Sequence, residues 1–485
     1  MFKKRFTIYI VIVLMVFTGM AFMLLNEGHN WGGDFALYLE EAEALSKGSL
    51  KELFIENSFT VEHSHKYLSP NLYPLGYPIF LLVPVLFFGK SLWVYKVLNI
   101  FLLVYLGWRI FRSNILFIQL PKWALIFGII LFLFRDTLFF QLEIIGPDIL
   151  FLVLVFECLF AFYSNNLLAT GILTLALLIT RDAGVIFWLL FNFYGLYFKN
   201  ISSLISFILG IILLVVFKDF AANHWDYFLV GINFATFREN LNLFYLESIE
   251  SLIPLDRFKN VFVSSSLLIL VIMGLSSNYR NDMRKLGFKK LKEVLVSKGF
   301  WITISLIVFI IVHLFWKSLA LRMFLIIDLF IIYFIMSSLT YLCWTLDKLK
   351  FQRVSLFSRV FKCIVFLFVG SVASKHVYRS YSWCYQPNSV FGDKVNNASA
   401  VIIWNAIKHH TEPNAIVVFR KPRVLRYYTK RRCCTQLDNG VLKFAEFYPV
   451  YRLKVKGLSY AKADNAVFIK IWSDGENSLE MVKPQ

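Results

Sequence analysis

The sequence predicts an all-α polytopic membrane protein, with about eleven transmembrane helices followed by a small C-terminal α/β domain. The first observation is compositional: 58% of the 485 residues are hydrophobic and only 17% are charged. A soluble chain of this length cannot cover that much apolar surface. The second is that Leu, Ile, Val and Phe form long uncharged runs, which need lipid as their solvent. The third is that the end of the chain loses these runs and is punctuated by Pro, Asn and Gly.

The chain begins with a basic segment and an apolar run, an arrangement that also occurs in signal peptides. Lys3, Lys4 and Arg5 precede the run Phe6–Leu25. This run is long enough to span a bilayer, and no small-residue cleavage site follows it. We therefore expect an uncleaved first transmembrane helix.

Eleven apolar runs are assigned as spans, and one further run, Tyr77–Phe88, is not. Crossing a hydrocarbon core of roughly 30 Å takes about 20 helical residues, and Tyr77–Phe88 is shorter and contains Pro84. We expect it to form an interfacial helix on the outer surface. The assigned spans are Phe6–Leu25, Leu92–Phe111, Trp123–Phe140, Ile149–Tyr163, Leu167–Thr180, Gly184–Phe198, Ile201–Phe217, Val261–Leu275, Phe300–Trp316, Met323–Trp344 and Leu356–Ala373.

The distribution of charge sets the orientation of these spans. With the N-terminus in the cytoplasm, the loop Asn26–Gly76 lies outside, and it holds eight acidic residues against three basic ones. Every strongly basic segment then lies inside, as the positive-inside rule requires. The basic residues of these segments are Arg109, Arg112, Lys122, Arg280, Arg284, Lys285, Lys289, Lys290, Lys292, Lys298, Lys348, Lys350, Arg353, Arg359 and Lys362.

The segment Leu167–Phe198 allows two interpretations. It is either one long helix broken at Arg181 and Asp182, or two short spans, which can be re-entrant. A single helix would reverse the orientation of every later loop, and the basic segment Ser276–Gly299 would then lie outside. We therefore predict two short spans.

Residues 1–374 are assigned to the transmembrane domain and residues 375–485 to an extracytoplasmic domain. Residues 26–91 form the first outer loop with its interfacial helices, and residues 218–260 form a second large outer loop. The charge pattern places the N-terminus in the cytoplasm. The absence of eukaryotic targeting signals and the short loops favour localisation in a bacterial inner membrane.

The C-terminal domain is predicted to contain a helix at Ala400–His410 and β-like runs at Ala415–Phe419 and Ala466–Ile471. The net charge of +19 is explained by basic cytoplasmic loops, so a nucleic-acid partner is not expected. The six cysteines show no metal spacing and no disulfide framework.

The first outer loop carries the most informative motifs. It opens with Trp31-Gly32-Gly33-Asp34-Phe35-Ala36-Leu37-Tyr38, so that an acidic residue follows a Gly-Gly turn just outside the membrane. Ala42 and Gly48 continue the pattern. The loop closes with Tyr73-Pro74-Leu75-Gly76-Tyr77-Pro78, and the following apolar run ends in Phe88-Gly89.

This set of motifs resembles the first outer loop of the GT-C glycosyltransferases, in the branch of the protein O-mannosyltransferases and the aminoarabinose transferases of lipid A. The resemblance covers most of the first 200 residues by motif and the rest by hydropathy. It implies an enzyme that transfers a sugar from a polyprenyl-phosphate donor to a lipid, glycan or protein hydroxyl, with inversion. Asp34 would be the base that takes the proton of the acceptor hydroxyl, and Tyr38 would lie at the substrate site. The alternative role of Asp34 is to cap the helix that follows it.

Several other charged residues are candidates through the same resemblance. Asp148 is the second catalytic candidate, and Glu143 lies nearby and competes for its role; the alternative for Asp148 is helix capping. Arg181 has the planar guanidinium that binds phosphate bidentately, although pairing with Asp182 or snorkelling explains it as well. His313, Lys317 and Arg322 flank an outer turn, where they are candidates for the carrier phosphate or for anionic lipid.

No metal site is assigned. Some members of the resembled superfamily use a divalent metal ion, but Asp34 lacks an adjacent second carboxylate, and this departure puts a metal requirement in doubt. His63 and His65 form only a loose ligand pattern, for which a solvated loop is the simpler explanation. The basic segments Arg420–Arg423 and Lys430–Arg432 are interpreted as a solvated face, with headgroup or carrier contact as the alternative.

A transporter or flippase of a lipid-linked or anionic substrate is the rival function. Such proteins often have matching pairs of interrupted spans in two repeats, and no such pair is evident here. The informative charges gather at one face instead, which favours a surface active site. A non-catalytic subunit of an envelope-polymer assembly is the third possibility, and it would leave Asp34 replaceable.

Overall fold

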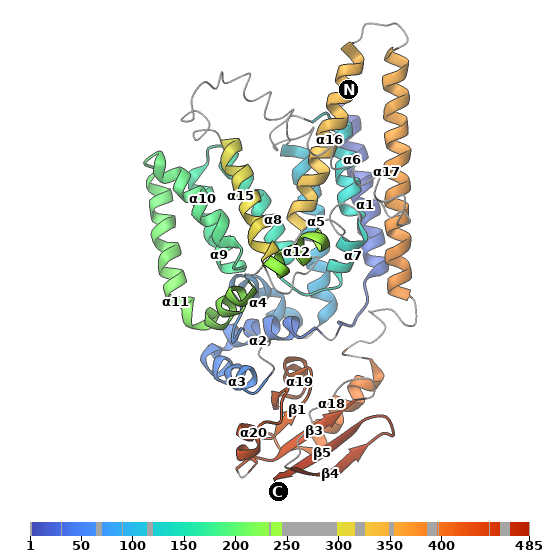
Figure 1. Cartoon of the computed structure of the whole chain (residues 1–485). Coiled ribbons are helices and arrows are strands. Elements are labelled where there is room, and N and C mark those ends of the chain that lie inside the picture. Colours follow the sequence, from blue (N-terminus) through green and yellow to red (C-terminus); the bar gives the residue numbers. More distant parts are fainter. Residues whose placement is uncertain are drawn as a thin grey trace.

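The computed structural model consists of a helical bundle above a small sheet domain (Figure 1). It describes residues 2–30, 32–64, 70–89, 91–113, 120–231, 234–244, 298–315, 325–348, 354–385, 395, 397–445, 447–455 and 466–484. The assigned span Val261–Leu275 and residues 245–260 of the second outer loop lie outside these residues. The N-terminus lies at the end of the bundle that points away from the sheet domain (Figure 1).

The bundle is built from helices that follow the apolar runs of the sequence. They share one continuous core, to which α1, α5, α6, α8, α15 and α16 each contribute buried apolar side chains. The helices are α1 (Phe2–Leu24), α5 (Leu92–Ser113), α6 (Lys122–Leu133), α7 (Asp136–Leu142), α8 (Asp148–Tyr163), α9 (Leu167–Thr180), α10 (Gly184–Tyr197), α11 (Ile201–Gly231), α12 (Phe234–Phe244), α15 (Lys298–Leu314), α16 (Leu325–Lys348) and α17 (Val354–Tyr385).

In the described part of the chain, fewer helices than the eleven predicted spans are both long enough and apolar enough to cross a membrane. Among the described residues, four helices are long and apolar enough to cross a membrane, or five if the bent pair α6 and α7 is one span. Several assigned spans form apolar helices of 10–17 residues instead, among them α9, α10 and α15. The count of about eleven therefore stays a prediction.

The segment after residue 167 forms two helices, as predicted. α9 ends at Thr180 and α10 begins at Gly184. At Gly184 a Cβ atom would collide with the backbone of Leu177, so only glycine allows α10 to turn back closely on α9.

Buried charged side chains lie at the bend between α6 and α7, whose axes differ by 59°. Arg135 at the break forms an ion pair of 2.8 Å with Asp328 on α16, and both side chains are almost fully buried. Asp136 lies 3.1 Å from a ring nitrogen of His376 on α17. These contacts connect three helices at one end of the bundle.

Three helices of the first outer loop, α2 (Asp34–Lys47), α3 (Leu50–Glu62) and α4 (Gly76–Phe88), lie between the bundle and the sheet domain (Figure 1). α2 ends at Gly48, which adopts the left-handed conformation that favours glycine. α4 is a short helix with an exposed apolar face that includes Phe87 and Phe88, which is consistent with the predicted interfacial helix.

The C-terminal domain contains a five-stranded sheet with the order β2-β1-β3-β5-β4. β1 pairs in parallel with β2 and β3, whereas β3, β5 and β4 pair antiparallel. The predicted helix and the two predicted strands are confirmed as α18, β1 and β4. The elements are α18 (Ala398–His410), β1 (Ile416–Val418), α19 (Pro422–Thr429), β2 (Arg432–Cys434), α20 (Asn439–Phe444), β3 (Val450–Lys454), β4 (Ala466–Ser473) and β5 (Ser478–Pro484).

Candidate functional site

Asp34 is the first residue of α2, at the face where the helical bundle meets the C-terminal domain. The N-cap position is Gly33, and no side-chain capping hydrogen bond is made there. Instead, Asp34 Oδ1 accepts a hydrogen bond of 2.9 Å from the hydroxyl of Tyr73. The side chain is therefore held toward the end of the first outer loop.

Tyr73 is itself fixed on several sides. Its ring stacks on that of Tyr38, with centroids 4.4 Å apart, and its backbone N–H donates to Glu41 Oε1 at 2.7 Å. Complete burial raises the pKa of Glu41 well above its usual range. Tyr38, Glu41 and Asp34 lie near one face of α2, since the spacing of about 3.6 residues per turn brings them together.

The C-terminal domain contributes a charged side chain to this group. Arg423 on α19 donates from Nη1 to the hydroxyl of Tyr73 at 3.3 Å and from Nη2 to the carbonyl oxygen of Pro70 at 2.7 Å. Its side chain is only 2% exposed. The interpretation of this basic segment as a solvated face is wrong for Arg423, because α19 docks against the first outer loop.

Lys421 precedes α19 and lies within electrostatic range of Asp34. Burial lowers the pKa of Lys421, and the neighbouring Arg420 charge lowers it further, whereas Asp34 acts in the opposite direction. A carboxylate of α2 and cationic groups of the C-terminal domain therefore share one site.

His29 lies beside α2 as a neutral ring. Burial, with a smaller contribution from the Lys96 charge, lowers the pKa of His29 to about 3. Its ring stacks on Phe35 with centroids 4.0 Å apart, and Nε2 accepts the backbone N–H of Ile145 at 3.1 Å. Nδ1 then carries the proton and donates to the carbonyl oxygen of Asn30 at 2.9 Å.

Glu143 forms a buried ion pair with Lys96 on α5, with Nζ and Oε2 2.6 Å apart. It also accepts the backbone N–H of Asn26 at 3.1 Å. Because both carboxylate oxygens have donors, Glu143 connects α1, α5 and α7 and is a weaker competitor for the role of Asp148.

Asp148 and Arg181 form a second group. Asp148 begins α8 without a capping hydrogen bond, and it pairs with the guanidinium of Arg181 at the end of α9. His313 lies within electrostatic range of Arg181; it is buried, and its Nδ1 donates to the carbonyl oxygen of Phe309 at 2.7 Å. The predicted candidates of three separate spans thus lie in one region.

Tyr77 links the two groups. Its ring meets that of Tyr38 edge-on, with centroids 5.1 Å apart, and it lies within electrostatic range of Asp148. An aromatic series of Tyr73, Tyr38 and Tyr77 therefore leads from the surroundings of Asp34 to those of Asp148. Lys317 and Arg322 lie outside the described residues.

The surroundings of Asp34 do not fit a divalent metal ion. Its described neighbours include the phenol of Tyr73 and the cationic Lys421, whereas such ions prefer several carboxylate or imidazole ligands. Within the described part of the chain, no three His, Cys, Asp or Glu side chains are grouped to hold a metal. His63 lies 3.3 Å from a carboxylate oxygen of Asp438, so it contributes to the contact between the first outer loop and the C-terminal domain.

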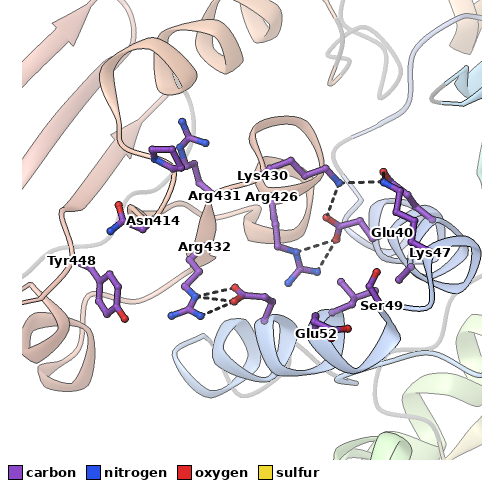
Figure 2. Close-up of a pocket in the computed structure, with 15 residues that line it drawn as sticks. Glu40, Lys47, Ser49, Glu52, Asn414, Arg426, Lys430, Arg431, Arg432 and Tyr448 are labelled. Atoms are coloured by element: carbon purple, nitrogen blue, oxygen red, sulfur yellow. Dashed lines mark hydrogen bonds and ion pairs between the residues drawn. The ribbon is translucent and has the colours of Figure 1, made fainter.

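A pocket of about 520 Å³ lies between α2, α3 and the C-terminal domain (Figure 2). Charged side chains of both parts line it and pair across it: Arg426 with Glu40 at 2.7 Å, and Arg432 with Glu56 at 2.6 Å. The pocket uses a different face of α2 from Asp34, because Glu40 is displaced by about 120° around the helix axis from Asp34.

Sequence reasoning missed two members of the site, Tyr73 and Arg423. Tyr73 was part of the motif that closes the first outer loop, and Arg423 stood among other basic residues. Neither position has a local signal for its contact, because 350 residues separate the two in the sequence.

Comparisons with known proteins bear on the fold of the chain. No protein-family model matches the chain, and no curated protein sequence matches it. The crystal structure of ArnT from Cupriavidus metallidurans bound to undecaprenyl phosphate is similar over 98% of both chains, with a TM-score of 0.57 and 13% identity. The apo structure of the same protein has a TM-score of 0.52 and 12% identity over the same share of each chain. The chain therefore has the fold of ArnT.

Proposed function

We propose that this protein transfers a sugar from a polyprenyl-phosphate donor to a hydroxyl of a lipid, glycan or protein acceptor. The observation that carries this proposal is the position of Asp34: it is held by Tyr73 where a bundle with the ArnT fold meets a cationic edge of the C-terminal domain. The solved ArnT relative binds undecaprenyl phosphate, which supports a polyprenyl-phosphate partner here. Membrane lipids surround the apolar helices.

The reaction is a direct displacement with inversion. Asp34 accepts the proton of the acceptor hydroxyl as its oxygen attacks the anomeric carbon of the sugar. The bond between that carbon and the phosphate oxygen breaks, and the polyprenyl phosphate leaves with the electron pair. Fixed cationic groups stabilise the leaving phosphate, because its charge develops in a site with few competing waters.

Asp148 and Arg181 support the donor side of this site. Arg181 has five N–H donors, and its pairing with Asp148 uses only part of them. The remaining donors are suited to a phosphate oxygen. His313 lines the same region, and Tyr38 supplies a ring against which the substrate binds. Lys317 and Arg322 are further proposed phosphate ligands.

The site faces the outside of the bacterial inner membrane in this proposal. The N-terminus lies in the cytoplasm, and residues 375–485 form the extracytoplasmic domain. In the fold, the first outer loop and this domain lie together at the end of the bundle away from the N-terminus (Figure 1). An acceptor from the outer compartment and a lipid donor from the bilayer both reach such a site.

The test is sugar transfer in membranes that contain the protein at equal levels. Radiolabelled polyprenyl-phosphate sugars are offered to wild type, Asp34→Asn and the control Glu56→Gln, whose carboxylate lies in α3 and pairs with Arg432. Transfer should occur with wild type and the control, and fall by about 10²- to 10⁴-fold in Asp34→Asn, since the base is lost. Equal transfer by all three proteins would remove Asp34 as the base.

A further inference from the structure

We propose that Arg423 of the C-terminal domain is a positioning residue for Asp34 and acts through Tyr73. The extracytoplasmic domain then completes the catalytic centre, in addition to its contacts with the first outer loop. This inference rests on the proposed function, because it assigns Arg423 a part in the same transfer reaction.

The direction of the hydrogen bonds carries the first step. A guanidinium only donates, so the hydroxyl oxygen of Tyr73 is the acceptor in its contact with Arg423. The single hydroxyl proton of Tyr73 is then free to point at Asp34 Oδ1, 2.9 Å away. Arg423 thereby sets which way Tyr73 donates.

The second step is the fixation of the phenol ring. Tyr38 stacks on one face of the Tyr73 ring, and the guanidinium carbon of Arg423 lies 5.6 Å from the ring centroid. The backbone of Tyr73 is held by Glu41. Loss of Arg423 would leave the hydroxyl end of the ring with fewer contacts, and Asp34 would be oriented less well toward the attacking hydroxyl.

The third step is the unusual chemical environment of Arg423. Two other arginines of this interface pair with carboxylates, Arg426 with Glu40 and Arg432 with Glu56 (Figure 2). The described hydrogen bonds of Arg423 go to a carbonyl and a phenol instead. Among the described residues its Nε is buried without a hydrogen-bond partner.

A buried guanidinium without a paired carboxylate is unfavourable for stability. Glu41 lies within electrostatic range of Arg423, and its burial favours the neutral acid. An arginine that only held the two domains together would stabilise the interface more if it paired with a carboxylate, as Arg426 does with Glu40. The placement of Arg423 is explained by its contact with Tyr73.

The experiment compares transfer kinetics of Arg423→Gln, Arg423→Lys, Tyr73→Phe and the double variant Arg423→Gln/Tyr73→Phe, with Arg432→Gln as the matched control at the same interface. The donor is the radiolabelled polyprenyl-phosphate sugar that wild type uses. Arg423→Gln should lower kcat by about 10- to 100-fold through lost orientation, with KM for the donor unchanged. Arg423→Lys should recover part of the loss.

The double variant should be no slower than Tyr73→Phe, since both changes break one chain of contacts. Arg432→Gln should retain wild-type kcat. Wild-type kcat in Arg423→Gln, or independent effects of Arg423 and Tyr73 that multiply, would overturn the inference. If Arg423→Gln does not accumulate in the membrane, Tyr73→Phe tests the inference instead, because it removes the hydroxyl and keeps the ring. An unchanged kcat in Tyr73→Phe would then overturn the inference that Asp34 is positioned through Tyr73. Wild type and Asp34→Asn are measured alongside. No transfer by wild type contradicts the proposed function, and full activity in Asp34→Asn removes Asp34 as the base. Loss of activity in Asp34→Asn with full activity in Tyr73→Phe contradicts only this inference.

Discussion

Arg426 of the C-terminal domain forms a buried, two-pronged ion pair with Glu40 of the first outer loop. Nη2 and Nε both donate to Glu40 Oε2, at 2.7 and 3.0 Å, and both side chains are about 5% exposed. The two residues are 386 positions apart. This pair connects the sheet domain to α2, the helix that begins with Asp34.

Breaking this pair should destabilise the protein strongly. Arg426→Gln removes both hydrogen bonds of the guanidinium to the buried Glu40 carboxylate and leaves, among the described residues, only Lys430, 3.9 Å from Oε1, as a nearby cation. We expect a loss of up to about 3–5 kcal/mol. Thermal unfolding of the purified protein in detergent measures the loss. Arg432→Gln is the control, because its pair with Glu56 is about one-third exposed and is worth about 1 kcal/mol or less. Equal melting temperatures for the two variants would show that the buried pair contributes no more to stability than the exposed one.

The pair of Arg135 and Asp328 should stabilise the bent end of the bundle. Asp328→Asn removes the partner of an arginine that is 2% exposed, so we expect a loss of about 3–5 kcal/mol. The comparison variant is Lys47→Gln, because the Lys47 side chain is 63% exposed and its pair with Glu43 should contribute little to stability. For each variant and for wild type, the measurement is the temperature at which half of the detergent-solubilised protein aggregates. An unchanged midpoint for Asp328→Asn would show that the pair contributes nothing.

Gly184 should be intolerant of any side chain. Its Cβ position is occupied by the Leu177 carbonyl group, so Gly184→Ala must displace backbone and should cost about 1–3 kcal/mol. Gly370→Ala is the matched control, because it lies within helix α17 with open space around it. There the same change should stabilise by about 0.5–1 kcal/mol. A stable Gly184→Ala protein would contradict the close packing of α9 and α10.

His29 should make the protein sensitive to acid. Its pKa falls from 6.5 to about 3 on folding, so below pH 6.5 the unfolded chain binds a proton that the folded chain does not. The contribution of the neutral His29 ring to the free energy of unfolding is fully present above pH 6.5. It is lost as the pH falls toward 3, with a limiting slope of about 1.4 kcal/mol per pH unit. Melting temperatures between pH 4 and 7 should fall less steeply for His29→Phe than for wild type. Parallel curves for the two proteins would exclude this role.

The sequence predicts those elements whose signal is local. The apolar runs predict α1, α5 and α16. The separation of α9 from α10 has a less local signal, the orientation that the positive-inside rule requires for the basic segment Ser276–Gly299. The short run at Ala415–Phe419 predicts β1, because its residues are all apolar and β-branched or aromatic residues predominate.

The contacts of the candidate site depend on tertiary structure and have no such signal. Arg423 belongs to a basic run that is typical of a solvated surface, yet docking of α19 buries it beside Tyr73. Asp148 and Arg181 are 33 positions apart, and only the packing of α8 on α9 brings them together. Resemblance indicated Asp34, Asp148 and Arg181, whereas geometry was needed to find the pairing of Arg181 with Asp148 and the contacts of Tyr73 and Arg423.

The most direct test of the proposed chemistry is a proteoliposome experiment with a radiolabelled polyprenyl-phosphate sugar and membrane acceptors from the source cells. Wild type should move label from the lipid donor to an acceptor, and Asp34→Asn should do so about 10²- to 10⁴-fold more slowly. Label that stays on the polyprenyl phosphate and crosses the bilayer equally with both proteins would contradict a transferase and would favour a flippase.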